Sequence, residues 1–133
     1  MHEGWKTEEQ IRADSLSKRV IGAAIEVHRT LGPGLLESCY ESCLCRELQL
    51  RQIPFERQVP LKLDYKGIHV DCAYRIDILV DNILILELKS VDKVEPVYKT
   101  QLLTYLRLSD LWLGLLLNFN EEVLKDGIYR VVN

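Results

Sequence analysis

The spacing of apolar residues predicts two helices in the first part of the chain. From Ser15 to Leu31 apolar residues recur every three or four positions, which is the period of a helix that buries one face. Gly32-Pro33-Gly34 then supplies a helix stop. A second helix is predicted from Leu35 to Leu50, because this stretch contains neither Gly nor Pro. Residues 1–14 show little of this periodicity, and we expect them to form a flexible N-terminal segment.

After Pro54 the pattern becomes that of strands. Apolar and polar residues alternate, and Lys66-Gly67 and Asp81-Asn82 have the composition of tight turns. The strands predicted from this pattern are residues 58–65, a segment from Ile68 onward, residues 73–80 and residues 83–89. This part of the chain is therefore predicted to be a meander of antiparallel strands.

The last third of the chain returns to one helix followed by two strands. Residues 96–108 have the helical period, with Pro96 acceptable in a first turn. Residues 111–119 are almost continuously apolar, which is typical of a strand covered on both faces, and 128–132 form a last short strand. The order ααβββαββ, without internal repeats, predicts an α/β fold in which helices flank a mixed central β-sheet. We expect residues 15–133 to form this single domain.

Composition excludes several other classes of protein. With 133 residues, of which 47% are hydrophobic and 28% charged, the chain can bury one core of ordinary size. The longest apolar runs, such as Leu111 to Leu117, fall far short of the roughly 20 residues that a membrane helix needs. The polar N-terminus lacks the apolar centre of a signal peptide, so we expect a cytoplasmic protein. The same run of leucines would suit a homodimer interface as readily as a core.

Charge and cysteine usage indicate neither a strong polyanion binder nor a zinc protein. The 17 basic and 20 acidic residues give a net charge of -3, so nucleic-acid binding would need locally grouped cations. Candidate groups, each equally explicable as a solvated face, are Lys62 with Lys66, Lys89 with Lys93, and Lys99 with Arg107. The four cysteines, which we expect to be reduced thiols without the C-x-x-C spacing of a zinc site, are Cys39, Cys43, Cys45 and Cys72.

Two carboxylates lie inside strands that are otherwise apolar. Asp77 and Glu87 are unusual in these strands, because a charge there is costly unless it is paired, metal-bound or at a solvated strand end. Glu87 and Lys89 share one strand face, which suits a carboxylate on a metal beside an ammonium near the attacking water. The alternative is a salt bridge at the strand ends among these three residues and Arg75.

The hairpin between the two strands must be irregular if the carboxylates are to meet. A two-residue loop at Asp81-Asn82 would pair Val80 with Ile83 and would place Asp77 and Glu87 on opposite faces. An odd loop, for example three residues with Asn82 left-handed, brings them to one face. We therefore predict an irregularity near residues 81 to 83.

Three further positions are weaker candidates. Gln101 and Tyr105 share a helix face, where they could reach a phosphate together, although a tyrosine among leucines is more often part of a core. Glu37 lies within about 20° of Leu44 and Leu48 on the helical wheel and is expected to face inward. A first-turn glutamate is also explained by the helix dipole. His28, near the Gly-Pro-Gly corner, is more readily a structural residue than a base.

Several motifs together resemble those of the GxxExxY family, which is similar to a compact branch of the PD-(D/E)XK nuclease superfamily. The resemblance runs from about Ile21 through Val132, and Ile76 stands where the superfamily name has Pro. The segments that carry it are Val27-His28, Gly34-Leu35-Leu36-Glu37-Ser38-Cys39-Tyr40, Asp77, Glu87-Leu88-Lys89, Gln101-Leu102-Leu103-Thr104-Tyr105, Asn118-Phe119 and Asp126-Gly127-Ile128.

The resemblance implies a site and an activity. By it, Asp77 and Glu87 would bind the metal, Lys89 would be the catalytic lysine, and Glu37 would be the acid carried by a helix. Gln101 and Tyr105 would form the helical motif of exonuclease-like members. The Leu88 carbonyl would complete an oxygen ligand set suited to Mg²⁺ or Mn²⁺. The expected reaction is phosphodiester hydrolysis of DNA or RNA. The alternative is a nucleic-acid or protein-binding module that keeps the fold without turnover.

Overall fold

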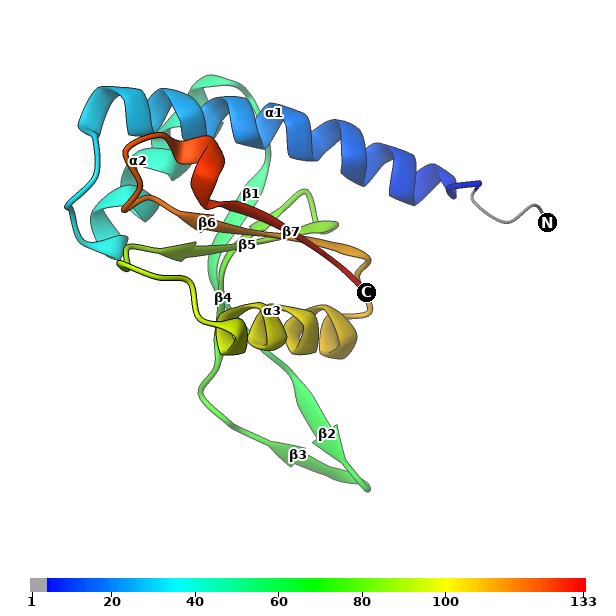
Figure 1. Ribbon diagram of the computed structural model, residues 1–133. Helices are drawn as coiled ribbons and strands as arrows, with labels where there is room; N and C mark the ends of the chain where they lie inside the picture. The colour runs from blue at the N-terminus through cyan, green and yellow to red at the C-terminus, as the bar shows by residue number, and fades with distance from the viewer. Residues whose placement is uncertain (1–4) are drawn as a thin grey trace.

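A five-stranded sheet separates the helices into two layers in the computed structural model, which describes residues 5–133 (Figure 1). The strand order is β1-β4-β5-β6-β7; β5 and β6 are parallel and the other neighbouring pairs are antiparallel. The sheet strands are β1 (Phe55–Pro60), β4 (Arg75–Val80), β5 (Leu84–Lys89), β6 (Leu113–Asn118) and β7 (Ile128–Val132). The predicted α/β class, its mixed sheet and the order ααβββαββ are therefore confirmed for the main sheet.

The helices cover opposite faces of the sheet. Helices α1 (Glu8–Leu31) and α2 (Glu37–Leu50) lie on one face, and α3 (Pro96–Ser109) lies on the other (Figure 1). On β5, Leu84, Leu86 and Leu88 belong to the core under α1 and α2, whereas Ile85 packs with α3. Because side chains alternate along a strand, Glu87 and Lys89 lie on the α3 face.

The apolar run at residues 111–117, which would suit either a core or a homodimer interface, belongs to the core. All six residues of β6 are buried within the single chain, between β5 and β7. A short 3₁₀ helix, η1 (Leu124–Gly127), precedes β7. Among residues 5–133, none of the helices combines the length and the apolar character needed to span a bilayer.

The start of α1 corrects one prediction. The helix begins at Glu8 rather than Ser15, inside the segment expected to be flexible; residues 1–4 of that segment lie outside the described residues. Thr7 forms a capping box, in which its side chain accepts from the Gln10 N–H and the Gln10 side chain accepts from the Thr7 N–H. Asp14 forms ion pairs with Lys6 and with Arg130 of β7, which ties this first part of the helix to the sheet. These interactions use polar residues, so apolar periodicity does not reveal them.

The predicted strand 58–65 is in fact two strands in different sheets. It divides after Pro60, and β2 (Leu63–Tyr65) pairs with β3 (Ile68–Val70) in a separate two-stranded sheet. Lys66 and Gly67 form the turn between them, as predicted. Pro60 pairs with Arg75 at the end of the main sheet, where β1 stops.

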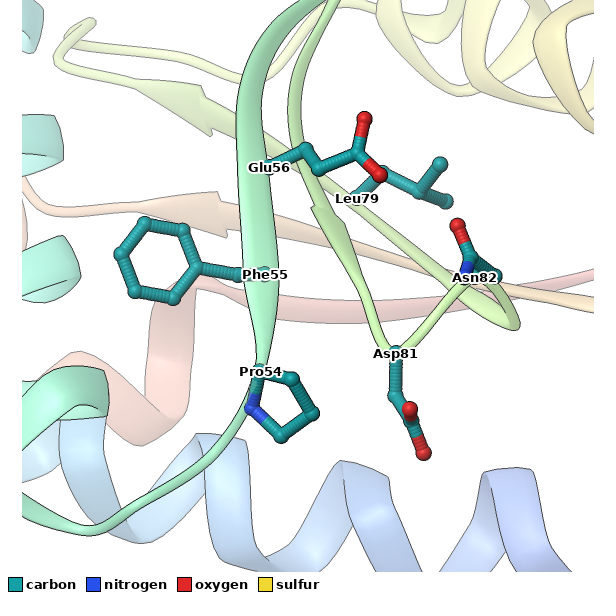
Figure 2. Close-up of a pocket in the computed structure, with 6 residues that line it drawn as sticks. All are labelled: Pro54, Phe55, Glu56, Leu79, Asp81 and Asn82. Atoms are coloured by element: carbon teal, nitrogen blue, oxygen red, sulfur yellow. The ribbon is translucent and has the colours of Figure 1, made fainter.

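The loop between β4 and β5 has the odd length that the sequence required. Val80 pairs with Leu84 and Ile78 with Leu86, so Asp81, Asn82 and Ile83 form a three-residue loop. Asp81 and Asn82 are both left-handed, with φ values of 50° and 58°. Figure 2 shows this loop above α1, with the Asp81 side chain pointing toward the helix, where its carboxylate lies 3.4 Å from the Arg12 guanidinium. The shallow pocket of Figure 2 lies at the loop end of β4 and is separate from Asp77.

Asn82 offers a direct test of the loop geometry. The N82V substitution should lower the free energy of unfolding by about 1–2 kcal/mol, because a β-branched residue tolerates the left-handed region poorly. The matched control N82G should be neutral or nearly so, since Gly enters that region freely. Urea unfolding of both variants measures the difference; equal stability of the two would contradict this loop geometry.

Candidate functional site

The start of α2 is held in place by one tyrosine. The Tyr40 hydroxyl donates to the Gly32 carbonyl at 2.6 Å and accepts from the Leu35 N–H at 3.1 Å. Its ring, fully buried, stacks on Phe119 with 4.6 Å between the ring centroids. The Gly-Pro-Gly corner is therefore anchored to the core, which fixes the first turn of α2, including Glu37, at one end of β5.

Asp77 and Glu87 meet where the backbone ladder of β4 and β5 ends. After the Ile78–Leu86 pair, side chains replace the backbone partners. The Asp77 N–H donates to Oε1 of Glu87 at 3.2 Å, and the Leu88 N–H donates to Oδ2 of Asp77 at 2.8 Å. Each carboxylate thus crosses to the backbone of the other strand. The arrangement holds the two carboxyl groups together, and their side chains also hydrogen-bond to each other.

Burial makes this pair of carboxylates costly to ionise. Glu87 is only 6% exposed, and burial, followed by repulsion from Asp77, raises its pKa from 4.5 to about 9. The pKa of Asp77 is also raised, mainly by burial and further by the charges of Glu41 and Glu37, against the lowering effect of the Leu88 N–H. With a pKa of about 9, Glu87 therefore keeps its proton at neutral pH unless a cation displaces it.

Lys89 lies beside the acids without forming an ion pair with them. Its ammonium sits 4.5 Å from the centroid of the Tyr98 ring on α3, and its charge lowers the pKa of both Asp77 and Glu87. None of the ion pairs in the described part of the chain joins either acid to a cation. Arg75 instead donates to the Gln58 carbonyl at 3.2 Å. The strand-end salt bridge considered from the sequence is therefore not what holds these carboxylates.

Helix α3 brings Tyr105 to the acids. Tyr105 is 5% exposed, and burial, then the charges of Glu87 and Asp77, raise its pKa to about 12. It also packs with Ile85 and Leu102, so Tyr105 is part of the core, and the two acids are near enough for their charges to act on its hydroxyl. Gln101, half-buried one turn earlier, forms no hydrogen bond to the acids among the contacts described for residues 5–133.

Glu37 corrects a second prediction. It was expected to face inward, but its side chain is exposed at the first residue of α2, where Oε2 accepts from the Ser90 N–H at 3.4 Å. Leu44 and Leu48 do point into the core, whereas Glu37, the first residue of the helix, lies outside it. Glu37 therefore lines the opening of the site.

Sequence reasoning missed Glu41, the acid that does point inward from α2. Glu41 is 8% exposed and lines a cleft of about 420 Å³ together with Glu37, Asp77 and Leu88. Its Oε2 accepts from both Nε and Nη2 of Arg57, at 3.2 and 2.8 Å, and its Oε1 accepts from Gln58. The available signal was its spacing of four residues from Glu37, which places both acids on one side of the helix.

Gln58 has an unusual backbone conformation for a residue within a strand. The pairs Arg57–Ile78 and Val59–Ile76 place it opposite Asp77, and its φ is 50°. Its side-chain amide donates to Glu41 at 2.7 Å. Non-glycine residues in this region are strained and persist where the surroundings over-determine them, often at functional sites. The strained backbone of Gln58 therefore lies next to Asp77.

The donor set fits a hard divalent cation. Within residues 5–133 no group of three or more His, Cys, Asp or Glu side chains is arranged to hold a metal ion. Mg²⁺, however, is usually bound by one or two carboxylates and keeps several water ligands. Asp77, which lines the cleft together with Leu88, and the adjacent Glu87 provide two such carboxylates. The residues present therefore suit Mg²⁺ or Mn²⁺ better than zinc.

The other candidates from the sequence have structural environments. His28 is buried, and its Nε2 lies 2.6 Å from the Glu121 carbonyl. This contact joins α1 to the loop before η1. Cys39, Cys43 and Cys45 lie on α2 and Cys72 precedes β4, and all four are free thiols.

The acid pair should reduce stability at neutral pH. Because the pKa of Glu87 is higher in the folded protein, its stabilising contribution is fully present below about pH 4.5 and is lost as pH rises toward 9. E87Q removes this titration, so in EDTA it should be more stable than the wild type by about 2–3 kcal/mol at pH 8, and by much less at pH 5.

Chemical denaturation across this pH range measures the effect. E122Q, at an exposed carboxyl before η1, is a matched control and should follow the wild-type profile. If E87Q gained no stability between pH 5 and pH 8, the two acids would not be crowded in a common buried site.

Comparison with known protein families matches residues 14–131 to the PD-(D/E)XK nuclease superfamily. Comparisons with curated proteins and with solved structures find no match. The family match covers α1 from Asp14 onward, all of α2 and α3, and the main sheet except the last residue of β7. It also includes the hairpin that brings Asp77 and Glu87 together. The chain therefore belongs to the PD-(D/E)XK nuclease superfamily.

Proposed function

We propose that this protein is a metal-dependent nuclease that hydrolyses phosphodiester bonds in DNA, or in RNA, and that it belongs to the GxxExxY branch of the superfamily. The observation that carries the proposal is that the carboxyl groups of Asp77 on β4 and Glu87 on β5 lie together. Lys89 follows Glu87 by two residues on β5. The crowding of two buried carboxyl groups supports a cation as their partner, because a bound cation would favour the ionised form of both.

Each residue of the site has a role in the proposed reaction. Asp77 and Glu87 would hold Mg²⁺ or Mn²⁺, with the Leu88 carbonyl as a further ligand and Glu37 acting through water. When bound, the cation would polarise the scissile phosphate and lower the pKa of a bound water. Lys89, close to both acids, would stabilise negative charge that develops on the phosphate.

Helix α3 would contribute the groups that hold the phosphate. The raised pKa of Tyr105 keeps its hydroxyl protonated at neutral pH, so it can donate a hydrogen bond. Gln101 would present its amide from the preceding turn of the helix. On the opposite side of the site, the bonds from Arg57 and Gln58 hold Glu41 in place and fix the shape of the cleft beside Asp77.

Metal binding tests the ligand assignment without reference to activity. Titration calorimetry with Mn²⁺ should give a saturable binding heat for the wild type. D77N and E87Q should each weaken binding at least about 10-fold, because each removes one of two anionic ligands. E122Q should bind like the wild type. Equal heats in the wild type and E87Q would contradict the assignment.

Cleavage assays test the reaction. The protein with Mn²⁺ should cleave at least one of four substrates: linear DNA, circular DNA, single-stranded DNA or RNA. K89A should reduce the rate by about 100-fold or more, since it removes a preorganised positive charge. K18Q, at an exposed lysine of α1 on the other side of the sheet, should retain full activity.

Two outcomes of this assay would contradict the proposal. Activity that survives unchanged in K89A would belong to a contaminating nuclease. A folded protein that binds Mn²⁺ but cleaves none of the four substrates would instead support a binding module that retains the fold.

A further inference from the structure

A hairpin arm, defined here as residues 62–75, extends from the molecule beside the site. It contains β2 and β3, which form their own sheet, and it projects beyond α3 away from the five-stranded sheet (Figure 1). Lys66 and Gly67 at its tip both have positive φ values, 47° and 88°, which is the pattern of a two-residue type I′ turn. The arm lies on the α3 side, the same side as Glu87 and Lys89.

The arm exposes three large side chains to solvent. Tyr65 is 58% exposed, Ile68 61% and Tyr74 51%. Tyr65 and Ile68 are paired across the ribbon, directly before and after the turn. No residue of the arm is a buried member of either core cluster. A lone two-stranded ribbon is marginally stable in water, so a bound partner would stabilise it.

The base of the arm is continuous with the site. The Leu61 N–H donates to the Tyr74 carbonyl at 2.9 Å, which closes the base. The Tyr74 ring lies 6.1 Å from the ring of Tyr105, centroid to centroid, at an angle of 52°. Two residues after the arm ends, the chain reaches Asp77. A ligand that occupies the site and continues past Tyr105 would therefore meet the arm.

The chemistry of the tip matches a nucleic-acid strand. The Lys66 ammonium lies 5.3 Å from the centroid of the Tyr65 ring, so a cation and an exposed aromatic face stand together. With Lys62 and Arg75, both exposed, the arm carries three cations against two acids, Asp64 and Asp71. Aromatic faces bind bases by stacking and adjacent cations bind phosphates, a combination that recognises single strands without regard to sequence.

A second copy of the chain is a poorer fit to this surface. A stable dimer buries about 800 Å² on each partner. The tip offers only Tyr65 and Ile68 as large apolar side chains, with the polar pair Asp64 and His69 between the strands. This patch is suited to one base or two, rather than to a protein interface.

We propose that the arm binds a single strand of nucleic acid that leaves the active site, with Tyr65 stacked on a base and Lys66 beside a phosphate. The inference rests on the proposed nuclease function and deepens it, because it gives the enzyme a contact with the strand outside the reacting phosphate. Duplexes with a single-stranded end should bind through the same contact.

Fluorescence anisotropy with labelled oligonucleotides tests the arm. The full chain carrying E87Q, which the proposed mechanism makes inactive, is titrated with single-stranded DNA and RNA and with blunt duplex DNA. Adding Y65A should weaken single-strand binding by about 5- to 100-fold. Adding K66Q should reduce the slope of log affinity against log salt concentration by about 0.7.

Matched controls are I11A and K18Q, which alter an exposed apolar residue and an exposed lysine on α1, across the sheet from the arm. Both should bind like the E87Q parent. Thermal unfolding of Y65A and K66Q should match the parent too, since neither side chain is buried in a core. A loss of binding in these variants can then be assigned to the contact itself.

The outcomes separate the arm from the activity. If the parent binds single strands and Y65A and K66Q bind them equally well, the arm inference is wrong and the nuclease proposal stands. If the parent binds no nucleic acid and the wild type cleaves none, both fail together. If Y65A abolishes a concentration-dependent dimer but leaves nucleic-acid affinity unchanged, the arm is a self-association surface and the inference is overturned.

Discussion

The register between β4 and β5 is the constraint on which the site depends. In an antiparallel hairpin, a change of one residue in the loop moves every side chain of one strand to the opposite face relative to its partner. The three-residue loop 81–83, with two left-handed residues, sets the register that puts Asp77 and Glu87 together. The two acids then bond to each other's strands in place of backbone partners. The conformation of this loop thus determines whether the two acids can form a common site.

The elements around this hairpin hold the other groups in reach. Tyr40 anchors the corner before α2 and so places Glu37 and Glu41 on the rim and the wall of the cleft. The segment after Lys89 is held in a similar way, because the buried Asn118 side chain bonds to both the N–H and the carbonyl of Val91. The buried acid pair is costly in the absence of a cation, which is the cost expected where function and stability compete.

Much of this structure is predictable from sequence because it follows from apolar pattern. Helix 96–109 follows the helical period of its apolar residues, helix 37–50 follows a stretch without Gly or Pro, and β6 follows a continuous apolar run. The odd loop followed from the requirement that two strand carboxylates share a face. Polar interactions were less predictable. The early start of α1 depends on the Thr7 capping box, and the end of β1 separates strands that the alternation of residues had joined.

The residues of the candidate site were also partly predictable from the sequence, again because of the apolar pattern. Asp77, Glu87 and Lys89 are conspicuous because they interrupt apolar strands. The inward position of Glu41 and the exposure of Glu37 depend on how α2 packs against the rest of the fold, which the helical wheel does not describe. The left-handed Gln58 opposite Asp77 has no sequence signal, since glutamine is not typical of that conformation.

The most direct test of the central claim is a crystal structure of the protein grown with Mn²⁺ and measured at a wavelength where manganese scatters anomalously. We predict an anomalous peak between the carboxylates of Asp77 and Glu87, with Val80 still paired with Leu84. A structure in which these two side chains lie on opposite faces of the sheet, or in which manganese binds elsewhere and not between them, would contradict it.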